Sequence, residues 1–203
     1  MKKKPIWKKS RRLGFSLLEN KKEFSRGKKR LTGPGQHGDK KKRAPSLFAV
    51  QNTATQVICG LHLLKKKQLK NLFTELKSKE GNMHEDLLIN LESRLGNLIF
   101  RSGLVNTSRF ARQWVVHGHF LVNGKKVDKP NYLVKPGSVI TLKEEMRNNE
   151  LIKQQLKQNI KTPVYLEVDK EKFNIVYSRC PSLEEAKRGI DISSVISRYK
   201  RRV

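Results

Sequence analysis

Four polar side chains recur at helical spacing near the middle of the sequence. Arg109, Arg112, Gln113 and His117 are separated by steps that place them on one face of a helix. The guanidinium group of arginine presents N–H donors in a planar fork, so it can bind two oxygens of one phosphate. The spacing therefore predicts a cationic helix face that binds phosphate, with a merely solvated charged face as the alternative.

Lysines extend this cationic pattern beyond the predicted helix. Lys125, Lys126, Lys129 and Lys135 surround two turn-forming segments that follow it. A contiguous basic patch is the electrostatic footprint of a nucleic-acid-binding surface, whereas scattered charges are not. We therefore expect the helix and the following turns to form one binding surface.

The sequence His117-Gly118-His119 could supply two metal ligands. It has no neighbouring cysteine, aspartate or glutamate that would complete a four-ligand site. We therefore predict no metal site and no cofactor. The two histidines are interpreted instead as helix-terminating residues that contact RNA.

A glycine-rich segment nearer the N-terminus could approach a phosphate closely. It consists of Gly33, Pro34, Gly35, Gln36, His37 and Gly38, and the basic run Lys40, Lys41, Lys42 and Arg43 follows it. The segment lacks the Gly-Lys-Ser/Thr ending and the preceding strand of a nucleotide-binding P-loop. Glycine permits close backbone approach, and the glutamine and histidine can donate hydrogen bonds. The pattern predicts an RNA-clasping turn, with a simple surface turn as the alternative.

No local signature of a catalytic site is present. Neither a Ser-His-Asp nor a Cys-His arrangement is indicated, and the acidic residues show no catalytic pattern. Cys59 and Cys180 are far apart and outside any Cys-x-x-Cys motif, which argues against a disulfide framework or a cysteine zinc site. With no apolar signal segment at the N-terminus, the sequence predicts a non-enzymatic protein of the reducing cytoplasm.

The overall charge indicates a polyanionic partner. The 203 residues include 45 Lys and Arg but only 18 Asp and Glu, a formal net charge of +27. Charge of this size repels itself unless a partner neutralises it, and nucleic acid does so while releasing condensed counterions. An anionic membrane is the alternative, but no apolar run approaches the ~20 residues of a membrane-spanning helix.

About half of the excess charge lies at the N-terminus. Residues 1–43 contain 17 basic and three acidic side chains and few apolar ones. Such a segment cannot bury enough apolar surface to fold alone. We predict an arm that is ordered by RNA, and a solubilising tail is the alternative.

Apolar periodicity predicts three helices. The first lies within residues 61–77, and the second runs unbroken over residues 82–101. The third covers residues 108–118, begins at a Thr107 or Ser108 cap and ends at Gly118.

Short strands are expected after the third helix. Asn123-Gly124 favours a two-residue hairpin within residues 120–127, and a β-branched strand follows within 134–143. Residues 146–159 are polar and either helical or a linker, while 162–169 and 172–178 have strand composition.

These elements predict an α+β protein. It consists of a mainly helical domain with a basic N-terminal arm, plus an inserted small module of two helices and a short antiparallel sheet. The segments expected are the arm (1–43), a helical domain (44–93), the RNA-binding module (94–145), and a linker, short strands and C-terminal helix that return to the helical domain (146–203).

Residues 94–144 resemble the RNA-binding module named after ribosomal protein S4. Because that module also occurs in other RNA-binding proteins, the flanks must identify the family. LTGPGQHGDKKKR (31–43), GNMHEDLL (81–88) and a C-terminus with Arg179, Pro181 and a basic end are similar to the S4 family of small-subunit ribosomal proteins.

The resemblance implies a structural constituent of the small subunit. Members of this family bind a helix junction in the 5′ domain of small-subunit ribosomal RNA, nucleate assembly of the subunit body, and influence translational accuracy together with ribosomal protein five. Neighbouring small-subunit proteins and messenger RNA near the entry channel are the further implied partners. The implied RNA-binding positions are Gly33 through Gly38 and, in the module, Ser108, Arg109, Arg112, Gln113, His117, His119, Lys125 and Lys126.

Two departures from the family bear on this interpretation. Gly96 stands where the family often has aspartate, and residues 46–60 carry no charge where the family usually has a strongly basic helix. The alternative function is an RNA-modifying or RNA-recycling protein that uses the same module. Such an enzyme would need a catalytic domain, for which the remaining segments are short and basic.

Overall fold

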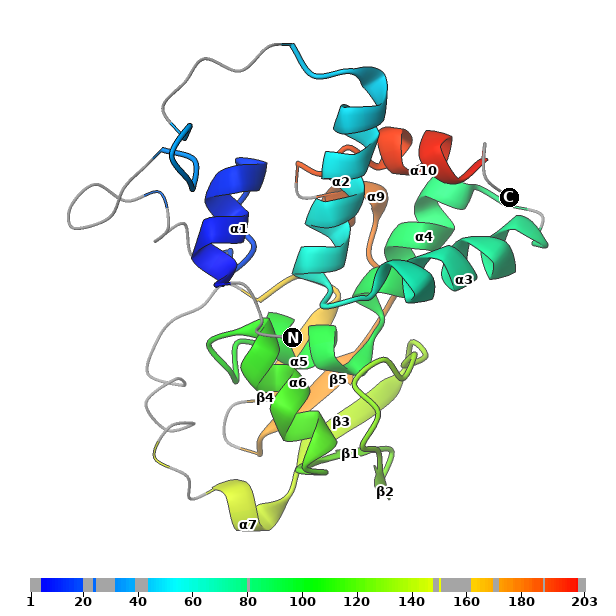
Figure 1. The fold of residues 1–203 in the computed structure, drawn as a ribbon. Coiled ribbons are helices and arrows are strands. Elements are labelled where there is room, and N and C mark those ends of the chain that lie inside the picture. Colours follow the sequence, from blue (N-terminus) through cyan, green and yellow to red (C-terminus); the bar gives the residue numbers. More distant parts are fainter. Residues whose placement is uncertain are drawn as a thin grey trace. The chain divides into compact units, whose positions relative to one another are not determined.

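The computed structural model describes residues 5–19, 24, 32–38, 44–79, 81–147, 150, 162–169, 172–187 and 189–200 (Figure 1). The chain divides into two compact units, Met1–Ser78 with Gly189–Val203, and Lys79–Arg188. The α+β class predicted from the sequence is confirmed. Within the described ranges, no helix is long and apolar enough to cross a membrane.

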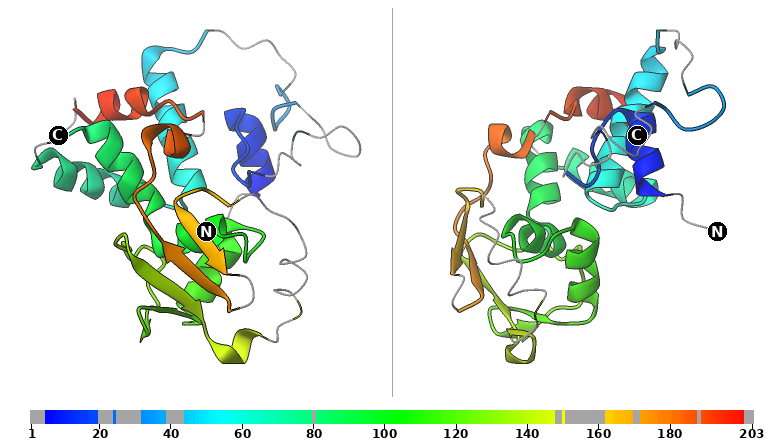
Figure 2. Two further views of the ribbon diagram at one scale, coloured as in Figure 1. Left: turned by 180° about the vertical axis from the view of Figure 1, so that it is seen from behind. Right: turned by 90° about the vertical axis from the view of Figure 1, so that its left-hand side faces the viewer.

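The first unit is built from helices. They are α1 (Ile6–Leu13), α2 (Leu47–Leu61), α3 (Lys66–Lys77) and α10 (Ile192–Lys200). The C-terminal helix α10 lies beside α2 in each view (Figures 1 and 2). The ring of Phe73 on α3 stacks on Tyr199 of α10 with centroids 4.5 Å apart. The end of the sequence therefore completes the core of the N-terminal unit.

The predicted helix within residues 61–77 is confirmed as α3, but it begins at Lys66. Its apolar stripe is buried as the spacing predicted and consists of Leu69, Leu72, Phe73 and Leu76. Leu61 is the last residue of α2, and Leu63 then adopts a positive φ of 51° that no continuous helix allows. The chain therefore turns between two helices before α3 starts.

The second unit contains an antiparallel sheet with helices on one side (Figure 2). Its helices are α4 (Met83–Glu92), α5 (Leu95–Arg101), α6 (Ser108–Val116), α7 (Glu144–Arg147) and α9 (Leu183–Lys187). Its strands are β1 (Phe120–Val122), β2 (Lys125–Lys126), β3 (Ser138–Leu142), β4 (Leu166–Asp169) and β5 (Asn174–Tyr177), in the order β2-β1-β3-β5-β4.

All the predicted strands are confirmed. Asn123 and Gly124 have positive φ angles of 48° and 77°, which the hairpin between β1 and β2 requires. The two strands that follow the polar segment extend the same sheet, because β5 pairs with β3. The sequence division at 94, 145 and 146 stays a prediction, since the compact unit itself spans Lys79–Arg188.

The prediction of a single helix over residues 82–101 is wrong. The structure has two helices there, separated at Ser93 and Arg94, and Arg94 adopts an extended conformation with ψ 136°. Its backbone forms an isolated β-bridge with Leu133. The next two N–H groups donate to carbonyls of the same partner segment, Leu95 to Tyr132 at 2.9 Å and Gly96 to Pro130 at 3.0 Å. Pairing with a distant segment therefore overrides a continuous helical pattern.

One apolar core lies between the sheet and helices α5 and α6. Leu98 and Ile99 of α5, Trp114 and Val115 of α6, and Phe120 of β1 are all buried in it. Strand β3 alternates buried and half-buried residues, as expected when one face of a sheet packs on helices. The core fixes the position of α6 against the sheet.

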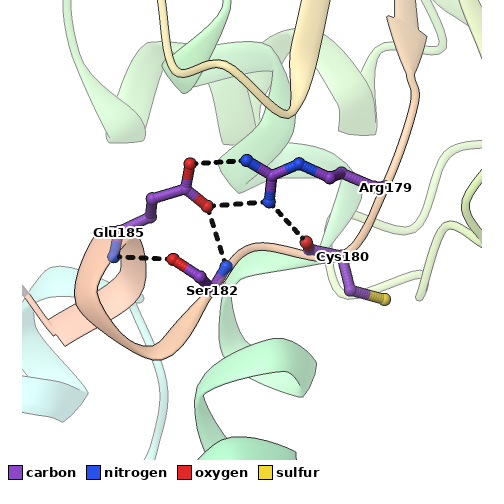
Figure 3. A network of polar contacts seen from close by, with 4 residues as sticks. All are labelled: Arg179, Cys180, Ser182 and Glu185. Atoms are coloured by element: carbon purple, nitrogen blue, oxygen red, sulfur yellow. Dashed lines mark hydrogen bonds and ion pairs between the residues drawn. The ribbon is translucent and has the colours of Figure 1, made fainter.

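A polar network organises the start of α9 (Figure 3). The backbone N–H of Ser182 donates to the Glu185 carboxylate at 2.8 Å, and the Glu185 N–H donates to the Ser182 hydroxyl at 3.4 Å, which is a capping box. Arg179 donates to both oxygens of the same carboxylate, at 2.7 and 2.9 Å. This guanidinium, with the Ser182 N–H, lowers the pKa of Glu185 to about 2.

Removal of the buried hydrogen bond between Ser93 and Tyr177 tests how firmly the helix break is held. The two hydroxyl groups lie 2.7 Å apart inside the core. Tyr177→Phe leaves the Ser93 hydroxyl without this partner, so we expect the free energy of unfolding to fall by roughly 1 to 2 kcal/mol. In urea titrations, the double variant with Ser93→Ala should lose less than the sum of the two single losses. Additive losses would contradict this account.

Burial of two tyrosines predicts a loss of stability at high pH. Burial raises the pKa of Tyr177 to about 12 and raises that of Tyr165 as well. Between the unfolded value near 10 and the folded value, the unfolded chain binds fewer protons, so the free energy of unfolding falls as pH rises. Because lysines titrate in the same range, urea unfolding of the unmodified protein and of Tyr165→Phe should be compared from pH 9 to 12. If the free energy of unfolding falls equally steeply with pH in both proteins, the prediction is contradicted.

Candidate nucleic-acid interface

Helix α6 separates an apolar face from a cationic one. Thr107 caps its N-terminus by accepting a hydrogen bond from the Phe110 N–H at 3.2 Å. Ala111, Trp114 and Val115 are buried. The predicted binding face consists of half-buried Ser108 and Arg112 with exposed Arg109, Gln113 and His117. The helix and the direction of its two faces are therefore as the spacing predicted, while phosphate binding by that face stays a prediction.

Arg112 is held by a contact outside its own helix. Its Nη1 donates to the Asn131 side-chain oxygen at 3.4 Å. Asn131 belongs to the same segment, residues 130–134, that pairs with the helix break at Arg94. The guanidinium is thereby positioned at the edge of the face.

The histidine pair lies at the C-terminal end of α6. The rings of His117 and His119 are 5.7 Å apart, and His119 also meets Trp114 edge-on. Burial, together with the neighbouring His117 and Lys143, lowers the pKa of His119. At neutral pH its imidazole is consequently a neutral hydrogen-bonding group. Across the described residues, no cluster of three or more His, Cys, Asp or Glu side chains could hold a metal ion.

The β1–β2 hairpin brings Lys126 to the same end of the helix. Lys125 and Lys126 form the exposed strand β2. Gly118 has a positive φ of 71°, and a Cβ placed there would lie 2.3 Å from the Cε of Lys126. The glycine thus allows the lysine side chain to pass directly over the end of α6. Lys126 thereby extends the cationic side of α6, and we call the surface made by Arg109, Arg112, Lys125 and Lys126 the α6–β2 face.

Sequence reasoning missed part of the surface beside this face. Tyr132 and Leu133 are 45% and 47% exposed, although large apolar side chains are usually buried. They lie between the exposed lysines Lys129 and Lys135. An aromatic residue among lysines in a turn is the signal that could have identified Tyr132, because RNA-binding surfaces use aromatic rings to stack on bases.

The glycine-rich segment forms a tight turn within the first unit. Gly35 has a φ of 106°, and the Gly38 N–H donates to the Gly35 carbonyl at 3.2 Å. A Cβ on Gly38 would overlap the carbonyl oxygen of Gly33, so only glycine fits there. Gln36 and His37 are exposed, as an RNA-clasping turn requires. The predicted contacts Lys40, Lys41, Lys42 and Arg43 lie outside the described residues.

Comparison with known proteins covers nearly the whole chain. Residues 1–92 match the family described as "Ribosomal protein S4/S9 N-terminal domain", and residues 93–140 match the "S4 domain". The chain belongs to the uS4 family of small ribosomal subunit proteins.

Curated relatives share this family over almost their full length. The "Small ribosomal subunit protein uS4" of Mesoplasma florum is 42% identical over 96% of this chain and 95% of its own. Those of Ureaplasma urealyticum and Geobacillus stearothermophilus are 45% and 40% identical, each over 97% of this chain and 96% and 97% of their own. The uS4 proteins are structural constituents rather than enzymes, which confirms the prediction that the chain is not an enzyme.

The structure shows which groups hold the backbone at Gly96. The first N–H groups of a helix need partners, and an aspartate side chain often supplies one. In α5 the backbone carbonyls of Tyr132 and Pro130 accept these bonds instead. A Cβ on Gly96 would lie 3.3 Å from the Pro130 oxygen, which is closer than ordinary packing. A side chain at this position would therefore require the Pro130 backbone to move by a few tenths of an ångström.

Substitution at Gly118 tests how the α6–β2 face is assembled. Gly118→Ala forces alanine into a left-handed backbone conformation and also displaces the Lys126 side chain. The control Gly124→Ala forces alanine into the same conformation but displaces nothing, because open space surrounds Gly124. Both variants should lose roughly 1 kcal/mol of unfolding free energy. Only Gly118→Ala should strongly shift the NMR signals of the Lys126 ε-methylene. Equal shifts in both variants would show that Lys126 does not cross the helix end.

Proposed function

We propose that this chain binds small-subunit ribosomal RNA through the α6–β2 face as a structural constituent of the ribosome in the cytoplasm. The observation that carries the proposal is the arrangement of Arg109 and Arg112 along the outer face of α6, with Lys126 beside its C-terminal end and Lys125 next to it, over an apolar core. Arginine forks and lysine ammonium groups on a fixed scaffold suit a folded phosphate backbone.

Family membership supports a proposal for the finer role. We propose that the RNA site is a helix junction in the 5′ domain, that binding there is early and nucleates the subunit body, and that the protein contributes to translational accuracy beside ribosomal protein five and near the messenger entry channel. The Gly33–Gly38 turn is proposed as a second RNA contact, because its exposed Gln36 and His37 can donate to phosphate oxygens. No observation favours the alternative of an RNA-modifying or RNA-recycling protein.

Salt-dependent binding to a 5′-domain RNA fragment tests the α6–β2 face. Each phosphate contact that is lost should lower the slope of log affinity against log salt by roughly 0.7 to 0.9. We therefore expect Arg109→Ala and Arg112→Ala each to weaken binding and to reduce this slope by roughly 0.7 to 0.9, the value for one phosphate contact.

The control is Lys172→Ala. Lys172 is exposed in the connection between β4 and β5, and β4 is the sheet edge opposite β2. The Lys172→Ala substitution removes the same charge without touching the α6–β2 face. The slope of log affinity against log salt should therefore remain that of the unmodified protein. Equal effects of all three substitutions would mean that overall charge, and not this face, determines binding.

A further inference from the structure

A groove lies between helices α4 and α9 of the second unit, and we call it the α4–α9 groove. Its volume is about 270 Å³, and the residues that line it are Glu85, Leu88, Ile89, Pro181, Ser182 and Leu183. Leu88 and Pro181 are buried and Ile89 is half-buried, so the floor is apolar. Pockets for small molecules usually measure roughly 300 to 1,000 Å³. The groove is therefore better matched to a side chain of a protein partner than to a free small molecule.

Leu183 leaves apolar surface uncovered beside this groove. It is the first residue of α9 and is 36% exposed. Single exposed apolar residues are common on protein surfaces and need no explanation. An exposed leucine that borders an apolar groove is different, because a partner can bury both at once. The leucine and the groove together provide an anchoring site for one apolar side chain.

The rim of the groove is acidic, although the chain as a whole carries a net charge of +27. Glu85 and Asp86 lie in the first turn of α4, and Glu184 and Glu185 lie in the first turn of α9. Among the described residues of these two turns and of the groove lining, none is lysine or arginine. The rim therefore has the opposite charge to the α6–β2 face.

The fold neutralises only part of this charge. Glu185 pairs with Arg179, which donates to both oxygens of its carboxylate (Figure 3). Glu85 accepts a hydrogen bond from the Asn82 side-chain amide at 3.0 Å, a neutral partner that leaves the negative charge in place. Glu184 is exposed. Each helix therefore contributes one exposed carboxylate to the rim, Glu85 from α4 and Glu184 from α9.

Helix stability accounts for the acidic residues but not for the groove. Carboxylates in a first turn interact favourably with the helix dipole, which explains why they are found at these two helix ends. The dipole does not explain an exposed leucine and an apolar concavity between the same turns. A protein partner accounts for both features, because complementary charge selects the partner while an apolar anchor in a pocket supplies affinity.

The sign of the charge determines which class of partner fits. Carboxylates repel the phosphates of nucleic acid and attract lysine and arginine. We infer that the α4–α9 groove docks another protein, through a lysine- or arginine-rich segment that places one apolar side chain beside Leu183. The cations of this segment pair with Glu85 and Glu184. The inference goes beyond RNA binding and does not depend on the α6–β2 face.

Photo-crosslinking in assembled small subunits tests the inference with the full-length protein. A benzophenone side chain replaces Leu183 in one protein and Ile89 in a second, and sedimentation with small subunits selects the molecules that have folded and assembled. After irradiation, mass spectrometry identifies what each position has captured. We expect both positions to capture the same segment of another subunit protein, with a surplus of lysine and arginine and an apolar residue at the crosslink.

Three results of this experiment would overturn the inference. They are crosslinks to RNA alone, crosslinks to a protein segment without surplus positive charge, and the absence of crosslinks from both positions. Because the salt-slope test of the α6–β2 face uses RNA alone, the two proposals succeed or fail separately.

Charge reversal tests the rim. The double variant Glu85→Lys, Glu184→Lys, with the benzophenone at position 183, should lower the yield of this crosslink roughly 5-fold or more, because two attractions become two repulsions. The matched control reverses two exposed carboxylates of α7, Glu144→Lys and Glu145→Lys. Helix α7 lies at the other end of the unit from α9 in each view (Figures 1 and 2), so the control should keep the normal yield. Equal yields from both double variants would overturn the inference.

Discussion

The short backbone pairing between residues 93–96 and 130–134 determines the geometry of the second unit. It breaks what would be a continuous helix, so that α4 and α5 are separate elements. It supplies the acceptors for the first N–H groups of α5, and it fixes the segment whose Asn131 holds Arg112. A few main-chain hydrogen bonds thereby connect the start of the helical layer to the cationic face of α6, and the Ser93–Tyr177 bond ties the same point to the sheet.

Three acidic residues hold parts of the fold together. Glu92 is buried and pairs with Arg101 while it accepts a hydrogen bond from Asn97. Glu185 pairs with Arg179, and Asp191 accepts the Ser194 N–H at the start of α10. None of these contacts involves a cation of α6 or β2. The positive surface is consequently available for a polyanion, and its remaining self-repulsion is the electrostatic reason that such a chain needs one.

Sequence patterns predicted the local structure well where local chemistry decides it. The Asn123-Gly124 hairpin, the Thr107 cap and the buried stripe of α3 each depend on a few neighbouring residues, and each is confirmed. The break at Arg94 was missed because its cause, the segment around Leu133, lies about forty residues away. Tyr132 was missed although it lies among lysines in a turn, because its 45% exposure is evident only in the folded loop. The direction of the α6 face was predictable from spacing, whereas the passage of Lys126 over Gly118 required the sheet.

Charge composition along the sequence gives a misleading picture of where a folded basic protein holds its positive charge. Residues 47–61 have no charge, so a count along the sequence assigns them no electrostatic role. In the folded unit the same helix has amides and a ring at a spacing of four, and each is met by a cation from elsewhere in the chain. Ordering a long basic side chain costs up to about 2 kcal/mol of rotamer entropy, and an amide acceptor meets part of that cost before any ligand arrives. The distribution of positive charge over the unit therefore depends on where the fold holds its cations and not only on which element carries them.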